Sequence, residues 1–74
     1  MLKTLRKQKG LTQVQLGKIS GLSQSYISDL EKNYFVSSPT IRQVLALSDA
    51  LDVDKVELFL YFAEKELEHT GNKW

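Results

Sequence analysis

The segment from residue 12 to residue 32, TQVQLGKISGLSQSYISDLEK, constrains the fold more than any other part of the sequence. Thr12 is a favourable N-cap residue, and Gln15 three positions later can complete a capping box. Gly21 can adopt the left-handed conformation that ends a helix, and Ser23 can cap a new helix directly afterwards. The segment therefore predicts two short helices joined by a tight turn.

The second of these helices is expected to present polar side chains outward. Ile27 and Leu30 lie three residues apart and would face the core. Gln24, Ser25 and Ser28 would then lie on the outer face near the N-terminal end, with groups that can hydrogen-bond to base edges. The same residues also fit an ordinary helical corner with a polar surface, so the two helices alone leave both interpretations open.

Three motifs flank and include this segment in a fixed order. They are L-R-x-x-x-G-L-T-Q, then S-x-S-Y-I-S-x-L-E, then P-T-I-x-x-V followed by L-S-x-A-L-x-V. With them, the chain from about Leu2 to Phe59 resembles the lambda-repressor-like, Xre-type helix-turn-helix family. The resemblance implies an all-α fold of five helices, DNA binding as a dimer, and control of transcription.

The resemblance also implies roles for residues at matching positions. Those expected near bases are Gln13, Gln24, Ser25, Ser28 and Asp29. Those expected near phosphates are Gln13, Ser23, Tyr26, Lys32 and Asn33. Tyr34 in the following loop and Arg42 near the start of the fourth helix are further phosphate-contact candidates. Arg6 is expected to form a partly shielded ion pair with Glu31, although a free surface arginine remains an alternative.

Two residues in the helix-turn-helix segment leave their roles open. Gly17 departs from the alanine that the family usually carries inside this helix. It could permit a closer helix contact, or it could be a tolerated weakness that costs about 1 kcal/mol relative to alanine. Tyr26 could reach a phosphate with its hydroxyl group or could serve packing only.

The spacing of apolar residues and caps predicts five helices, at about 2–9, 12–20, 23–32, 39–51 and 55–68, within one domain spanning 1–69. Residues 70–74 are expected to be a frayed tail. Ser38 and Pro39 are expected to start the fourth helix, as N-cap and first-turn residue. Its expected core stripe is Ile41, Val44, Leu47, Ser48 and Leu51.

The last helix carries two apolar faces. One comprises Val56, Phe59, Leu60, Ala63 and Leu67, and the other comprises Leu58, Tyr61 and Phe62. A terminal helix on a small domain cannot bury both faces in its own core, so a second copy of the chain is the expected partner. Tyr61, Phe62 and Leu67 are the expected dimer contacts, unless Tyr61 and Phe62 lie against the body of the domain. The apolar loop residues at 34–36 could pack on the core or join the self-association surface.

Charge and composition narrow the functional classes. Residues 1–37 hold six basic and two acidic side chains, a net charge of +4, whereas residues 38–74 hold four basic and seven acidic ones, a net charge of −3. This division is expected if one end of the molecule faces a polyanion, although it could also arise by chance. The chain has no Cys and a single His, His69, so we expect no metal site and no cofactor.

The leading hypothesis is a bacterial or phage DNA-binding regulator of the repressor type, which binds an inverted-repeat operator with the third helix in the major groove. The alternative is an antitoxin or antirepressor module that chiefly holds another protein. An enzyme is not expected, because the sequence lacks a nucleophile, a base and a phosphate-binding loop in any recognisable arrangement. The absence of a signal peptide and of a long apolar run predicts a cytoplasmic, nucleoid-associated protein with no place in a membrane. No small-molecule ligand is expected, because the sequence shows no second domain that could sense one.

Overall fold

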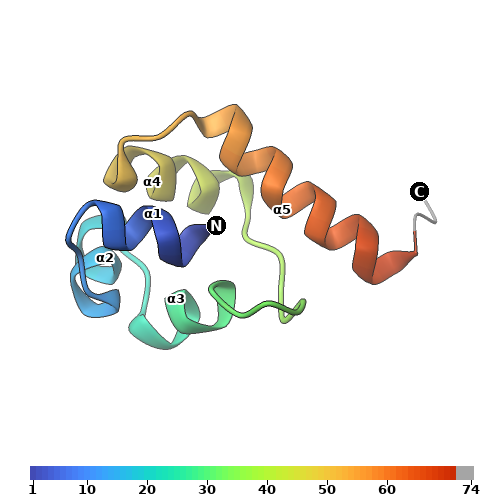
Figure 1. The fold of residues 1–74 in the computed structure, drawn as a ribbon, viewed down its shortest axis with the longest axis horizontal. Coiled ribbons are helices and arrows are strands. Elements are labelled where there is room, and N and C mark those ends of the chain that lie inside the picture. Colours follow the sequence, from blue (N-terminus) through green and yellow to red (C-terminus); the bar gives the residue numbers. More distant parts are fainter. Residues whose placement is uncertain (72–74) are drawn as a thin grey trace.

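The computed structural model describes residues 1–71, and residues 72–74, which belong to the expected frayed tail, lie outside the described part. The described residues form an all-α fold, as predicted, with overall dimensions of 36 × 22 × 20 Å. Its helices, shown in Figure 1, are α1 (Leu2–Gln8), α2 (Gln13–Ser20), α3 (Gln24–Leu30), α4 (Ile41–Leu51) and α5 (Lys55–Thr70). None of the helices in residues 1–71 is both long and apolar enough to cross a membrane.

The two helices of the central segment begin at the residues that the caps predict. The Thr12 side chain accepts a hydrogen bond from the backbone N–H of Gln15, and the Gln15 side chain accepts one from the backbone N–H of Thr12 at 2.8 Å. Gly21 ends α2 with φ at 76°, and the Ser23 hydroxyl accepts from the backbone N–H of Tyr26 at 3.1 Å. These bonds satisfy N–H groups that a helix leaves unpaired at its start, so local sequence sets both helix starts.

Gly17 allows the turn between α2 and α3 to lie directly against α2. A Cβ atom at this position would lie 2.6 Å from the carbonyl oxygen of Leu22, a distance that real Cβ atoms essentially never show. The backbone N–H of Leu22 also donates to the carbonyl oxygen of Gly17 at 2.9 Å. Of the two interpretations left open by the sequence, the structure therefore favours a close contact that needs glycine.

The start of α4 differs from the prediction. Thr40, not Ser38, is the N-cap, and it forms a capping box with Gln43. The Ser38 hydroxyl lies before the helix and donates to Glu66 of α5 at 2.8 Å. Ile41 is consequently the first residue of the helix and is 69% exposed, so its expected place in the core stripe is wrong.

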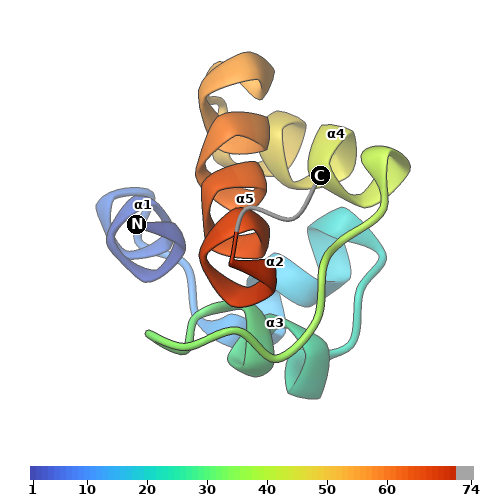
Figure 2. The same ribbon diagram turned by 90° about the vertical axis from the view of Figure 1, so that its right-hand side faces the viewer.

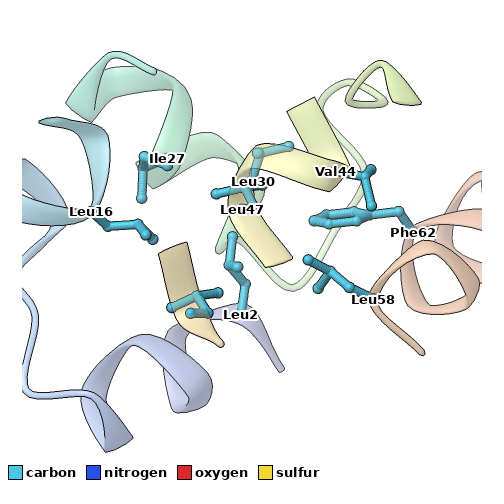
Figure 3. Packing of buried hydrophobic residues seen from close by; sticks show 9 residues of the cluster. Leu2, Leu16, Ile27, Leu30, Val44, Leu47, Leu58 and Phe62 are labelled. Atoms are coloured by element: carbon cyan, nitrogen blue, oxygen red, sulfur yellow. The ribbon is translucent and has the colours of Figure 1, made fainter. Parts of the chain in front are cut away.

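One hydrophobic core joins all five helices. Figure 3 shows Phe62 of α5 directed toward Val44 of α4, and Leu47 of α4 beside Leu30 of α3. The buried apolar residues are Leu2, Leu16, Ile27, Leu30, Val44, Leu47, Leu51, Leu58 and Phe62. Because α4 supplies the middle of this core, α3 is fixed at one edge of the bundle while α5 covers another (Figure 2).

The face of α5 that was expected to contact a second copy of the chain is instead the face that is buried in the core. Leu58 and Phe62 are buried in the core of the single chain, and Tyr61 packs against it. Phe62, which was expected at a dimer contact, is only 6% exposed, because the spacing of Leu58, Tyr61 and Phe62 places all three toward α4 and the core. Phe59 and Leu60 are instead exposed on the outer face.

Candidate nucleic-acid interface

The N-terminal turn of α3 forms an open polar edge of the molecule. Gln24 and Ser25 are exposed and Ser28 is half-buried. Figures 1 and 2 both place α3 at the margin of the bundle, with no other helix lying outside it. Their amide and hydroxyl groups are therefore accessible to an incoming ligand, as base-edge recognition requires.

A hydrogen bond connects the first residues of α2 and α3. Gln24 donates from Nε2 to Oε1 of Gln13 at 3.4 Å, and Gln13 donates from Nε2 to Oε1 of Glu31 at 3.1 Å. This arrangement leaves Gln24 with a carbonyl oxygen and a second N–H group for other partners. An adenine offers the complementary donor and acceptor on its major-groove edge, so the groups that Gln24 has left are of the type that can bind adenine.

Glu31, which accepts the hydrogen bond from Gln13, forms a shielded ion pair with Arg6 and so connects α1 to the end of α3. Arg6 contacts Glu31 through Nε at 2.6 Å and through a second guanidinium nitrogen at 3.1 Å, and it also donates to the carbonyl oxygen of Leu11 at 2.7 Å. The side chains of Arg6 and Glu31 are only 9% and 5% exposed. Such a bidentate pair fixes geometry as well as charge.

Burial and hydrogen bonding oppose each other at the Glu31 carboxyl group. Burial raises its pKa, whereas hydrogen bonds from Arg6 and Gln13 and the positive charge of Arg6 lower it, and the net result is a pKa below the ordinary value of 4.5. The hydrogen bond to Glu31 in turn raises the pKa of Arg6, against the effect of burial. The pair is therefore fully charged at neutral pH. Glu31 also accepts a hydrogen bond from Gln13, and this bond positions the side chain that accepts from Gln24.

The expected contacts at the end of α3 are partly engaged with each other. Lys32 lies 3.1 Å from the Asp29 carboxylate, and its ammonium group lies 5.9 Å from the centre of the Tyr34 ring. The hydrogen bond to Asp29 is the main cause of a raised pKa at Lys32. Asn33 and Tyr34 are exposed in the loop that follows. In the free protein the Asp29 carboxylate therefore lies beside the Lys32 ammonium group and partly offsets its positive charge.

The remaining expected contacts have structural partners or lie apart. The Tyr26 hydroxyl donates to the side-chain oxygen of Gln43 at 2.9 Å, which ties α3 to α4. The Ser23 hydroxyl is used as the cap of α3. Arg42 is exposed near the start of α4, on a different element from the polar edge. Within residues 1–71, no group of three or more His, Cys, Asp or Glu side chains is placed to hold a metal ion.

The contact between Lys65 of α5 and the end of α3 was not predicted from the sequence. Its ammonium group donates to the backbone oxygens of Leu30 at 3.2 Å and of Lys32 at 2.8 Å, at the end of α3. A signal was present, because Lys65 follows Leu58 by seven residues and so belongs to the inward face of the helix. A lysine at that register must find polar partners on the body of the domain.

The fold and the site together define a helix-turn-helix DNA-binding domain. The chain belongs to the lambda-repressor-like, Xre-type helix-turn-helix family, whose family model matches residues 2–58.

Three curated proteins illustrate this relationship. The chain is 44% identical over 54 residues to an uncharacterized HTH-type transcriptional regulator, y4dJ, of Sinorhizobium fredii, covering 73% of this chain and 68% of that protein. It is 36% identical over 52 residues to the immunity repressor protein of Bacillus phage phi105, covering 70% of this chain and 35% of the repressor. It is 29% identical over 58 residues to the ImmF control region 10 kDa protein of the same phage, covering 78% and 64%.

Proposed function

We propose that this chain is a sequence-specific DNA-binding transcriptional regulator of the repressor type. The observation that carries the proposal is the open polar edge of α3, with Gln24 oriented by Gln13 and backed by the shielded Arg6–Glu31 pair. Membership of the helix-turn-helix family and similarity to a phage immunity repressor support it.

In this proposal α3 enters the major groove with its N-terminal turn against the bases. Gln24, Ser25 and Ser28 supply amide and hydroxyl groups for base edges, and Gln13 holds the amide of Gln24 in position. Contacts to the phosphate backbone come from Lys32 and its neighbours Asn33 and Tyr34, with Ser23, Tyr26 and Arg42 as further candidates, whereas Asp29 is a further candidate for a base contact. Phosphate contacts set the position on the duplex, and base contacts set the specificity.

A second copy of the chain completes the proposed binding unit. Two adjoining hollows of about 460 and 210 Å³ lie between α4 and α5 and share Ile41, Val44 and Phe59 in their lining. The outer face around them carries large apolar side chains that are 43–69% exposed. These are Ile41, Leu45, Val56, Phe59 and Leu60. Contiguous apolar surface of this kind is typical of an association site, and a two-fold pairing would present two copies of α3 to one duplex.

This face replaces most of the dimer contacts expected from the sequence. Of those residues, Leu67 lines the larger hollow and remains a candidate, Tyr61 is half-buried against the core, and Phe62 is buried within it. The corresponding operator would be an inverted repeat with half-sites about 34 Å apart, which is roughly one turn of B-DNA.

Selection from a pool of random duplexes at a stated salt concentration tests the proposal. We expect an enriched inverted repeat, and we expect Gln24→Ala to bind it about 10-fold or more weakly with a changed base preference at one position in each half-site. Ser37→Ala, a substitution of an exposed loop residue, serves as the control. Absence of any enriched sequence with the folded wild-type protein would exclude the assignment.

The exposed apolar face also favours a second candidate function, an antitoxin or antirepressor module that holds another protein. Tyr34 and Val36 in the loop extend the exposed apolar character beyond the α4–α5 face. In that case the partner protein would be required for DNA binding, and the purified chain alone would select no duplex. The same selection experiment therefore separates the two functions.

A further inference from the structure

Lys65 holds the C-terminal end of α3 from a distance of more than thirty residues along the chain. Leu30 is the last residue of α3, and its carbonyl oxygen is among those that a helix leaves without an internal partner. Lys65 donates to this oxygen and to that of Lys32. Its side chain is half-buried, and burial lowers its pKa. In the described part of the chain no carboxylate pairs with it, so the two carbonyl groups are its principal partners.

Two neighbours of Lys65 hold the loop that follows α3. Glu66 accepts a hydrogen bond from the hydroxyl of Ser38 at 2.8 Å. The ring of His69 stacks on the ring of Phe35, with the centroids 4.0 Å apart and the planes inclined by 13°. The second half of α5 therefore contacts the segment 30–38 at its beginning, middle and end. Figure 1 shows this segment running beside α5 on its way from α3 to α4.

These contacts belong to a part of the chain that the family model does not cover. The match ends at residue 58, whereas Lys65, Glu66 and His69 lie about two to three turns further along α5. The segment that they hold contains Lys32, Asn33 and Tyr34, which are the proposed phosphate contacts. A part of α5 beyond the matched region thus contacts the segment that carries the proposed phosphate contacts.

We propose that Lys65 is a positioning residue, which fixes the end of α3 and the following loop in the conformation that binds DNA and does not itself touch the duplex. The inference rests on the proposed function. Its physical basis is preorganisation, because a loop that is ordered before binding loses less conformational entropy when it meets the phosphates. Without Lys65, the loop would have to be ordered when it binds DNA, and the entropy cost of that ordering would weaken the affinity.

The test compares two charge-removing substitutions on the same helix. Lys65→Met removes the donor to the two carbonyl groups, and Glu68→Gln removes an exposed charge near the end of α5 that lines neither hollow of the proposed dimer face. Fluorescence anisotropy with the selected duplex at fixed salt should show an affinity about 10-fold lower for Lys65→Met and within about 2-fold of wild type for Glu68→Gln. Lys65→Arg should restore most of the affinity, because a guanidinium group can also donate to two carbonyl oxygens.

Amide hydrogen exchange in the free protein supplies a readout that does not depend on DNA. Lys65→Met should accelerate exchange at residues 31–36 while leaving the amides of α2 unchanged, and Glu68→Gln should change neither. If Lys65→Met does not fold, Lys65→Gln, whose shorter side chain cannot span both carbonyl groups, replaces it under the same criteria.

Equal affinities for Lys65→Met and Glu68→Gln would overturn the inference, as would unchanged exchange at residues 31–36 in Lys65→Met. If the wild-type protein selected no duplex, the proposed function would fail. The exchange experiment would then decide separately whether Lys65 orders this segment, so the two failures are distinguishable.

Discussion

At the scale of single residues, Gly17 is the glycine whose surroundings leave least room for a Cβ atom. Gly17→Ala would improve helix propensity by about 1 kcal/mol, but its methyl group would meet the fixed carbonyl oxygen of Leu22 rather than a flexible side chain. We expect the steric cost to prevail and the free energy of unfolding to fall by about 1–2 kcal/mol, as measured by urea titration. Ile19→Ala, at an exposed site on the same helix, is the control. An unchanged or higher urea midpoint for Gly17→Ala would show that the turn can move away.

The Arg6–Glu31 pair makes stability depend on acid pH. The pKa of Glu31 in the folded protein lies below its ordinary value of 4.5, so its contribution is present above that pH and is lost as the pH falls through the folded pKa. Glu31→Ala leaves Arg6 buried without its partner and should cost about 3 kcal/mol at neutral pH.

Urea unfolding of wild type and Glu31→Ala at pH 7 and at about pH 3 checks this expectation. The difference between the two proteins should be large at pH 7 and should shrink at the lower pH. Glu64→Ala, at an exposed position on α5, should differ little from wild type at either pH. A difference of equal size at both pH values would mean that the charge of Glu31 is not its source.

Residue patterns predicted the parts of the site that depend on neighbours in sequence. Thr12 and Ser23 bond to backbone groups three residues away, and both caps occur as expected. Lys65 could not be assigned in this way, since its partners lie 33 and 35 residues earlier and are backbone atoms, which carry no residue signature. The pairing of Asp29 with Lys32, three residues apart, was in principle visible in the sequence.

At the scale of helices, the sequence predicted where helices lie along the chain better than it predicted which face of each helix is buried. Both Ser38 and Thr40 are good N-cap residues, and in the structure Thr40 caps α4 whereas Ser38 donates to Glu66, which is 28 residues later in the chain. Likewise α5 carries two apolar faces, and only packing against α4 decides which is buried. Leu58 and Phe62 contribute to the core, whereas the opposite face stays open.

The open face of α5 yields a prediction about assembly. Phe59→Glu places a charge on the proposed dimer contact at a side chain that is 47% exposed in the single chain, so the domain should still fold. Sedimentation velocity should show a dimer for wild type and a monomer for the variant, with equal helix content by circular dichroism. Glu64→Gln, a polar replacement on the same helix, is the control. A variant that sediments like wild type would locate the association surface elsewhere.

At the scale of the whole molecule, the unequal distribution of charge connects the fold to its proposed ligand. The half of the sequence that contains α3 carries a net charge of +4, and the half that contains α5 carries −3. Close approach to a polyanion is therefore favoured at one end and opposed at the other. The proposed dimer face belongs to α4 and α5, which lie in the acidic half of the sequence.

Salt dependence measures how many cations this arrangement places on the DNA. Lys32→Ala should weaken binding to all duplexes to a similar extent and should reduce the slope of log affinity against log salt by about 1 for each copy bound. Lys55→Ala, in the acidic half, removes the same charge and should leave the slope unchanged. Asp29→Asn should act in the opposite direction to Lys32→Ala, because it releases Lys32 from its 3.1 Å carboxylate contact for a phosphate. Equal slopes for Lys32→Ala and wild type would show that Lys32 remains with Asp29 when DNA is bound, and that the end of α3 contributes its shape rather than its charge.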